Sequence, residues 1–213
     1  MDEVVLIDKP KEWTSFDVVG KIRSKLRQET GQKVKVGHAG TLDPLATGLL
    51  IILIGKATKR QDSYMKQDKV YEVSLKLGQT STTADEEGEK TTVSDVVPSQ
   101  TEVEEAVHSF IGEISQIPPA YSAIKIDGQR AYKLAREGKE VTIEPRQVTV
   151  YTIDDLRYEY PMVYFTTKVS SGTYIRSLVT DIGHALQTGA YMTDLRRTSI
   201  GEFTVADAQK VDA

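Results

Sequence analysis

The order of apolar and polar positions predicts both helices and strands in the first third of the chain. Residues 4–9 form a short, mainly apolar run that ends at Pro10, which cannot donate to a strand ladder, so we expect a strand there. Apolar residues then recur at helical spacing from Val18 to Leu26. Thr14 or Ser15 can cap this helix.

Strand patterns dominate the centre and the C-terminal half. Residues 49–55 are continuously apolar and branched, as in a strand buried on both faces, and residues 71–78 alternate as in a half-buried strand. We expect further strands at 148–159, 162–171 and 201–205, helices at 102–110 and 173–186, and a strand, turn and short basic helix within 116–141. The polar, acidic run that ends at Asp95 is expected to be a loop. Because strands and helices are not evenly interleaved, the sequence predicts an α+β domain with a mixed sheet.

Length and composition limit the number of domains, the kinds of metal site and the cellular location that we expect. The 213 residues favour one large domain, and the absence of cysteine excludes disulfides and thiolate metal sites. The acidic N-terminus does not have the pattern of a signal peptide, and the longest apolar run, residues 49–54, is too short to cross a bilayer. We therefore expect a cytoplasmic protein without a membrane span.

Charge is distributed unevenly along the chain. The net charge of −4 argues against a nucleic-acid partner, yet residues 21–69 contain eleven basic and four acidic side chains. An acidic remainder does not cancel such a cluster beyond a screening length of about 10 Å. The cluster indicates RNA, although each lysine taken alone could equally belong to a solvated helix face.

The densest motif is Gly-His-Ala-Gly-Thr-Leu-Asp-Pro-Leu-Ala-Thr-Gly at residues 37–48. Its glycines allow close approach of a ligand to the backbone, and Pro44 constrains the chain directly after Asp43. A carboxylate on such a loop can act as a nucleophile or a base, but the same residues also occur in ordinary turns. The loop lacks the Gly-Lys-Ser/Thr ending of a phosphate-binding loop.

Three further blocks accompany this loop: Lys-Val-Tyr at 69–71, Pro-Pro-Ala-Tyr-Ser-Ala-Ile-Lys at 118–125, and Gly-Thr-Tyr-Ile-Arg-Ser-Leu at 172–178 followed by Leu-Arg-Arg at 195–197. In this order and spacing, the chain closely resembles the bacterial tRNA pseudouridine synthases of the TruB family, which modify uridine 55 in the T-loop. The resemblance extends from about Leu6 to Phe203.

The resemblance implies the pseudouridine-synthase fold, with a central, mainly antiparallel mixed sheet flanked by helices. It implies one catalytic domain over residues 1–213 with a thumb-like segment at about 116–146, and we expect no C-terminal PUA domain. The implied substrate is the T-arm of tRNA. No cofactor, metal, membrane or obligatory protein partner is expected.

The resemblance also implies roles for individual residues. Asp43 corresponds to the catalytic aspartate, which either attacks C1′ or assists formation of a glycal, and the sequence leaves both routes open. Arg176 corresponds to an arginine that pairs with this aspartate. Tyr71 corresponds to a tyrosine that stacks on the flipped uracil and takes a proton. The positions that line the flipped nucleotide correspond to His38, Tyr174 and Leu195.

Basic residues resemble positions that contact RNA. They are Lys9, Lys59 and Lys125, together with Arg130, Lys133 and Arg136, whose spacing of three places them on one face of a helix.

Three other functions compete with this interpretation. An RNA chaperone without turnover would share the pocket, but Asp43, Tyr71 and Arg176 are all present. A guide-RNA-dependent synthase would need partner-binding extensions. A nucleoside or glycoside hydrolase also cleaves a glycosidic bond, although such enzymes normally use two carboxylates and the motifs here supply one.

Overall fold

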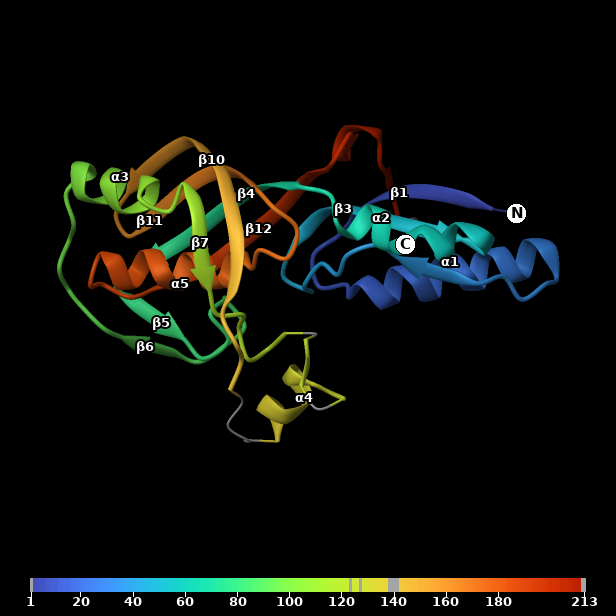
Figure 1. The fold of residues 1–213 in the computed structure, drawn as a ribbon, viewed down its shortest axis with the longest axis horizontal. Helices are drawn as coiled ribbons and strands as arrows, with labels where there is room; N and C mark the ends of the chain where they lie inside the picture. The colour runs from blue at the N-terminus through green and yellow to red at the C-terminus, as the bar shows by residue number, and fades with distance from the viewer. Residues whose placement is uncertain (1, 123, 127, 138–141, 212–213) are drawn as a thin grey trace. The chain divides into compact units, whose positions relative to one another are not determined.

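The computed structural model describes residues 2–122, 124–126, 128–137 and 142–211. The chain forms two compact units, Met1–Glu72 with Leu195–Ala213 and Val73–Asp194. Strands β4 (Lys69–Leu77) and β12 (Ala190–Ile200) pass from one unit to the other (Figure 1).

The first unit contains a sheet with the strand order β14-β1-β3-β12. Strand β3 pairs with β1 and β2 in antiparallel fashion and with β12 in parallel, and β14 is parallel to β1. The elements besides β4 and β12 are β1 (Glu3–Lys9), α1 (Ser15–Thr30), β2 (Val36–His38), β3 (Thr47–Ile54), η1 (Gly55–Arg60), α2 (Gln61–Met65), β13 (Phe203–Thr204), η2 (Val205–Asp207) and β14 (Gln209–Lys210).

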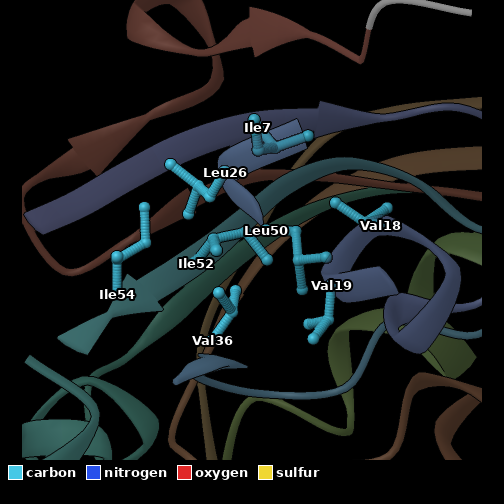
Figure 2. Close-up of a cluster of buried hydrophobic side chains, with 8 residues drawn as sticks. All are labelled: Ile7, Val18, Val19, Leu26, Val36, Leu50, Ile52 and Ile54. Carbon is cyan, nitrogen blue, oxygen red and sulfur yellow. The ribbon is translucent and has the colours of Figure 1, made fainter. Parts of the chain in front are cut away.

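Strand β3 lies at the centre of two apolar clusters because its side chains alternate between the two faces of the sheet. Leu50, Ile52 and Ile54 join one cluster with residues of β1, α1 and β2, which Figure 2 shows as a group of side chains pointing toward one another. Leu49, Ile51 and Leu53 join a second cluster with residues that include Ala39, Tyr64 and Ile200. A strand covered on both faces has no polar face, which explains its continuous apolar sequence.

Helix α1 begins where its sequence predicts. The Thr14 hydroxyl accepts from the Asp17 N–H over 3.0 Å, and the Asp17 carboxylate accepts from the Thr14 N–H over 2.8 Å, which completes a capping box. Gly31 ends the helix in the left-handed region at φ 69°. Val18, Val19 and Leu26 form the buried face of the helix.

The second unit contains a sheet with the strand order β12-β4-β11-β10-β7. Strand β10 pairs in antiparallel fashion with β11 and β7, and helix α3 packs against β10 and α5. The other elements are β5 (Gln79–Ser81), β6 (Lys90–Thr92), α3 (Gln100–His108), β7 (Gly112–Gln116), β8 (Lys125–Ile126), β9 (Gln129–Arg130), α4 (Ala131–Arg136), β10 (Arg146–Glu159), β11 (Met162–Val169) and α5 (Ile175–Ala185).

The predicted α+β class with a mainly antiparallel, mixed sheet is confirmed. The expected strands at 4–9, 49–55, 71–78, 148–159 and 162–171 and the expected helices at 102–110 and 173–186 are present with shifted ends. In the thumb-like segment, β8 and α4 match the expected strand and short helix, but Arg130, expected on one helix face with Lys133 and Arg136, lies on β9 and not on α4. Ala123, Asp127 and residues 138–141 lie outside the described residues.

Two expectations about loops were wrong, and one strand was not expected. The motif expected to be irregular begins as strand β2 and ends within β3, because both segments find ladder partners. The acidic run expected to be a loop contains the β5–β6 hairpin. Strand β12 was not expected, because polar residues interrupt its apolar pattern. Among the described residues, no helix has the length and apolar character needed to cross a membrane.

Truncating Leu50 tests the importance of the cluster on β3. We expect Leu50→Ala to lower the free energy of unfolding by about 2–5 kcal/mol, because Leu50 is fully buried and its cavity lies within a packed strand. Urea denaturation measures this loss. The control Val93→Ala removes a half-exposed side chain and should stay within about 0.5 kcal/mol. Equal effects of the two changes would contradict a core organised around β3.

Candidate active site

Asp43 lies in a loop of residues 39–46 that connects β2 to β3. At the start of the loop, the Ala39 N–H donates to the Ile51 carbonyl over 2.9 Å, which extends the sheet pairing. A turn follows the carboxylate, since the Ala46 N–H donates to the carbonyl of Asp43 over 3.1 Å. The carboxylate therefore belongs to a short, structured segment attached to a strand buried on both faces.

The turn between β1 and α1 holds this loop on one side. The buried Ser15 hydroxyl accepts from the Leu42 N–H over 2.9 Å and donates to the Leu42 carbonyl over 3.0 Å. The Glu12 N–H donates to the Pro44 carbonyl over 2.8 Å. Both chain neighbours of Asp43 are thus bonded to the same turn.

Lys9, the last residue of β1, also supports the loop. Its amine is fully buried and donates to the carbonyls of Pro10, Trp13 and Pro44 over 2.8, 2.6 and 3.4 Å. Burial lowers the pKa of the amine to about 8, against an opposing attraction to the Asp43 carboxylate. A buried amine with three carbonyl acceptors is not placed to contact a phosphate. We therefore correct the role expected for Lys9 from an RNA contact to a support of the loop.

Arg197 of β12 holds the loop on another side. Its side chain is buried, and Nε donates to the Leu49 carbonyl over 2.8 Å. The two terminal nitrogens donate to the carbonyls of Thr41 and Gly40 over 3.3 and 3.2 Å. Strands β3 and β12 approach so closely here that a side-chain carbon at Gly48 would overlap the Arg197 backbone.

His38 ends β2 and contacts an aromatic side chain. Its ring lies edge-on to the ring of Phe16, with 5.3 Å between the centroids. Burial lowers the pKa of His38 and the charge of Arg197 lowers it further, against a hydrogen bond with the Gly40 backbone that raises it. The imidazole is therefore neutral at pH 7.

Two further predicted residues belong to the same unit. Tyr71 lies on β4 and Leu195 on β12, and both side chains are buried. The first unit thus contains four of the six residues predicted to act on or line the nucleotide, His38, Asp43, Tyr71 and Leu195.

Arg176, in the first turn of α5, is buried in the second unit with a charged partner. Its Nη1 lies 3.4 Å from a carboxylate oxygen of Asp85 and donates to the Thr83 carbonyl over 3.1 Å. Its Nη2 donates to the Tyr121 carbonyl over 2.8 Å. Asp43 belongs to the other unit, so the expected pairing of Arg176 with Asp43 stays a prediction.

Tyr174 caps the N-terminus of α5 and is fixed through its backbone. The buried Gln116 side chain accepts from the Tyr174 N–H over 2.7 Å and donates to the Tyr174 carbonyl over 3.0 Å. One helical turn on, the Ser177 hydroxyl donates to the Ile117 carbonyl over 2.7 Å. The start of α5 is therefore bound firmly to the end of β7 and the residue after it.

Sequence reasoning gave no role to Asp85 or Arg197. Asp85 is buried beside Arg176 and also accepts from the Thr83 hydroxyl and the Glu87 N–H. Arg197 stands within the Leu-Arg-Arg block at 195–197, one of the blocks that carry the family resemblance, and that position was the available signal for it. For Asp85, which lies in the acidic run that ends at Asp95, nothing in the residue type indicated burial.

The remaining predicted RNA contacts are only partly described. Lys59 on η1 and Lys133 on α4 are exposed, as a phosphate contact requires. The side chains of Lys125, Arg130 and Arg136 lie outside the described part of the structure.

Comparison with protein families gives two matches. Residues 25–175 match the N-terminal domain of the TruB family pseudouridylate synthases. Residues 176–213 match the tRNA pseudouridylate synthase B C-terminal domain. Together the matches cover the described parts of the candidate site from residue 25 onward, so that Lys9, Glu12, Ser15 and Phe16 precede them.

Individual relatives cover nearly the whole chain. The tRNA pseudouridine synthase B of Clostridium kluyveri is 46% identical over 208 residues, covering 98% of this chain and 70% of the relative. That of Parabacteroides distasonis is also 46% identical, covering 95% of this chain and 87% of the relative.

Solved structures agree in fold. A chain in the crystal structure of a Cbf5-Nop10-Gar1 complex matches with a TM-score of 0.74 and 32% identity. A chain in the structure of an H/ACA RNP bound to a substrate RNA containing 2'-deoxyuridine matches with a TM-score of 0.69 and 30% identity. These alignments cover 98% and 97% of the present chain but about half of each solved chain, 52% and 50%.

Replacing Asp85 tests its pairing with Arg176. We expect Asp85→Asn to lower the free energy of unfolding by about 3 kcal/mol, because it removes a buried carboxylate that pairs with a buried guanidinium. The neighbouring Glu86→Gln removes a half-exposed partner of Lys90 and should cost at most about 1 kcal/mol. Urea denaturation of both variants makes the comparison, and an Asp85→Asn protein as stable as Glu86→Gln would refute the buried pair.

Proposed function

The chain belongs to the TruB family of pseudouridylate synthases, and from this premise we propose that it modifies uridine 55 in the T-loop of tRNA with Asp43 as the catalytic carboxylate. Its activity is the isomerisation of uridine to pseudouridine in tRNA. One observation favours Asp43 for this role. Buried groups of Lys9, Ser15 and Arg197 form hydrogen bonds that hold its loop in place.

The chemistry requires a carboxylate held in one position. The bond between N1 and C1′ breaks, the detached uracil turns, and C5 bonds to C1′. C5 loses its proton and N1 gains one, so the product is an isomer of uridine. Positive charge develops on the sugar as the first bond breaks, and a fixed carboxylate stabilises it without reorganisation. Asp43 then either adds to C1′ or removes the proton that yields a glycal.

Residues of the first unit suit a base that has left its stack. A flipped base must recover its unstacking energy from apolar and aromatic surface. The neutral ring of His38 and the buried side chains of Tyr71 and Leu195 supply such surface in the first unit. Tyr174 would add a further aromatic face. We assign stacking on uracil to Tyr71, with its hydroxyl taking the proton from C5.

Arg176 is proposed to orient the Asp43 carboxylate. A guanidinium can donate to several acceptors in one plane, which a lysine amine cannot. In the second unit this fork already serves Asp85 and two carbonyls, so its orientation is fixed before RNA binds.

RNA affinity is proposed to come mainly from phosphate contacts in the T-arm. The exposed Lys59 and Lys133 are the described candidates, and Lys125, Arg130 and Arg136 join them by resemblance. We propose that the cytoplasmic enzyme acts without an obligatory protein partner, in contrast to a chain assembled with partner proteins in a Cbf5-Nop10-Gar1 complex.

The Asp43→Asn variant tests the catalytic carboxylate. We expect no measurable pseudouridine formation and tRNA affinity within about threefold of wild type, because affinity depends on phosphate contacts elsewhere. Tritium release from tRNA labelled at uridine C5 measures turnover, and filter binding measures affinity. Asp62→Asn, an exposed aspartate on α2, is the control and should keep full activity. Turnover by Asp43→Asn would refute the mechanism, and release of free uracil by the wild-type chain would instead indicate a hydrolase.

The Tyr71→Phe variant separates stacking from proton transfer. Phenylalanine keeps the aromatic face but has no hydroxyl, so we expect near-normal tRNA binding with turnover reduced by about 100-fold or more. Tyr64→Phe changes another buried tyrosine of the same unit, packed against Phe203, and should leave turnover unchanged. Normal turnover by Tyr71→Phe would restrict Tyr71 to stacking.

A further inference from the structure

Arg197 combines a buried charge with acceptors that are all neutral. The residue is 1% exposed, and its guanidinium donates to the carbonyls of Leu49, Thr41 and Gly40. Burial of a charge is costly, and an apolar side chain of similar volume often fills such a position without loss of stability. Filling the core is therefore a poor explanation for an arginine here, and the position of its acceptors offers a better one.

The three acceptors lie on both sides of Asp43 in the sequence. Gly40 and Thr41 precede the aspartate by three and two residues, and Leu49 stands within β3, which follows the loop. One planar group therefore closes the loop at its base. A lysine amine is a single point on a flexible stem and cannot reproduce the same fork of donors.

The other contacts of the loop complete this support. Ser15 binds both backbone groups of Leu42, while Lys9 and Glu12 bind the Pro44 carbonyl. Arg197 supplies the side-chain contacts to the segment before these residues. Without Arg197, two carbonyls in the stretch that leads into Asp43 would lose their hydrogen-bond donor.

The charge of Arg197 also changes the pKa of nearby side chains. It lowers the pKa of Lys9 and His38, which adjoin the loop, and also that of Lys69 on β4. For His38 this repulsion favours the neutral ring that faces Phe16. The guanidinium thus has an electrostatic effect that can be measured separately from its geometric one.

We propose that Arg197 is a positioning residue for the reaction, which holds the Asp43 carboxylate in place by binding the carbonyls of Gly40, Thr41 and Leu49. The proposal rests on the proposed role of Asp43. Because Arg197 is buried behind the loop, it acts on the rate of the chemical step and contributes little to RNA affinity.

Arg197→Lys and Arg197→Met separate geometry from charge. The measurements are urea denaturation, tRNA affinity, and the single-turnover rate of tritium release at saturating tRNA and at a temperature where the variants are folded. We expect Arg197→Lys to lower the rate by about 100-fold with affinity within about threefold of wild type, as expected when a reacting group is displaced by about 1 Å.

Lys69→Met is the matched control. Lys69 is another buried cation of the same unit that donates to backbone carbonyls, those of Met65 and Gln67. Its replacement should cost stability but leave the single-turnover rate within about threefold of wild type. An equal loss of rate in Lys69→Met and Arg197→Lys would reduce Arg197 to general support of the unit and overturn the proposal.

The titration of His38 gives an independent readout. The chain has three histidines, so their ring signals can be followed individually by NMR. The His38 pKa should rise in Arg197→Met, which removes the repelling charge, and stay near the wild-type value in Arg197→Lys. A slow Arg197→Lys enzyme with an unshifted His38 would attribute the lost rate to geometry rather than charge.

Two further outcomes would overturn the proposal. One is an Arg197→Lys enzyme whose rate stays within about threefold of wild type. If the Arg197 variants do not fold, Ser15→Ala removes another buried side-chain support of the loop, and the second outcome is an unchanged rate in that folded variant. A wild-type chain that releases no tritium would contradict the proposed function itself, so the two failures are distinguishable.

Discussion

Residues 39–46 run between two strands without regular pairing of their own, so their buried carbonyl and amide groups need partners elsewhere. Those partners are Lys9 at the end of β1, Glu12 in the turn that follows, Ser15 at the start of α1 and Arg197 on β12. The position of the Asp43 carboxylate is therefore set by the packing of the whole first unit. The apolar clusters on the two faces of β3 hold these elements together. A shift in the packing of either cluster would therefore change the position of the carboxylate through these hydrogen bonds.

The second unit uses similar bonds at the start of α5. Arg176 binds two backbone carbonyls and one carboxylate, and Gln116 binds both backbone groups of Tyr174. In both units a long polar side chain enters the interior to satisfy backbone groups at a turn or a helix end. Such bonds are strong because the surrounding dielectric is low, and they specify one geometry because few other acceptors are available.

Elements whose pattern is complete within one segment were predictable. The continuous apolar run of β3, the capped periodicity of α1 and the amphipathic α5 each showed their burial in their own residues. Strand β12 was not predictable in this way, because Arg197 occupies an inward position where the pattern calls for an apolar residue. The short β5 and β6 consist mainly of polar residues, and their pairing with each other stabilises them.

The sequence by itself determined the class of chemistry, since its four motif blocks indicated the family and singled out Asp43 before any contact was known. Only the tertiary structure decided what supports that carboxylate. It showed that Lys9 lies in the interior and not on the predicted RNA surface. It also identified Asp85 as a buried partner of Arg176, and Arg197 as a buried donor to the loop of Asp43. The physical reason is that these residues act on backbone carbonyls and on side chains up to 157 positions away in sequence. A backbone carbonyl belongs to every residue type, so its need for a donor leaves no trace in the sequence.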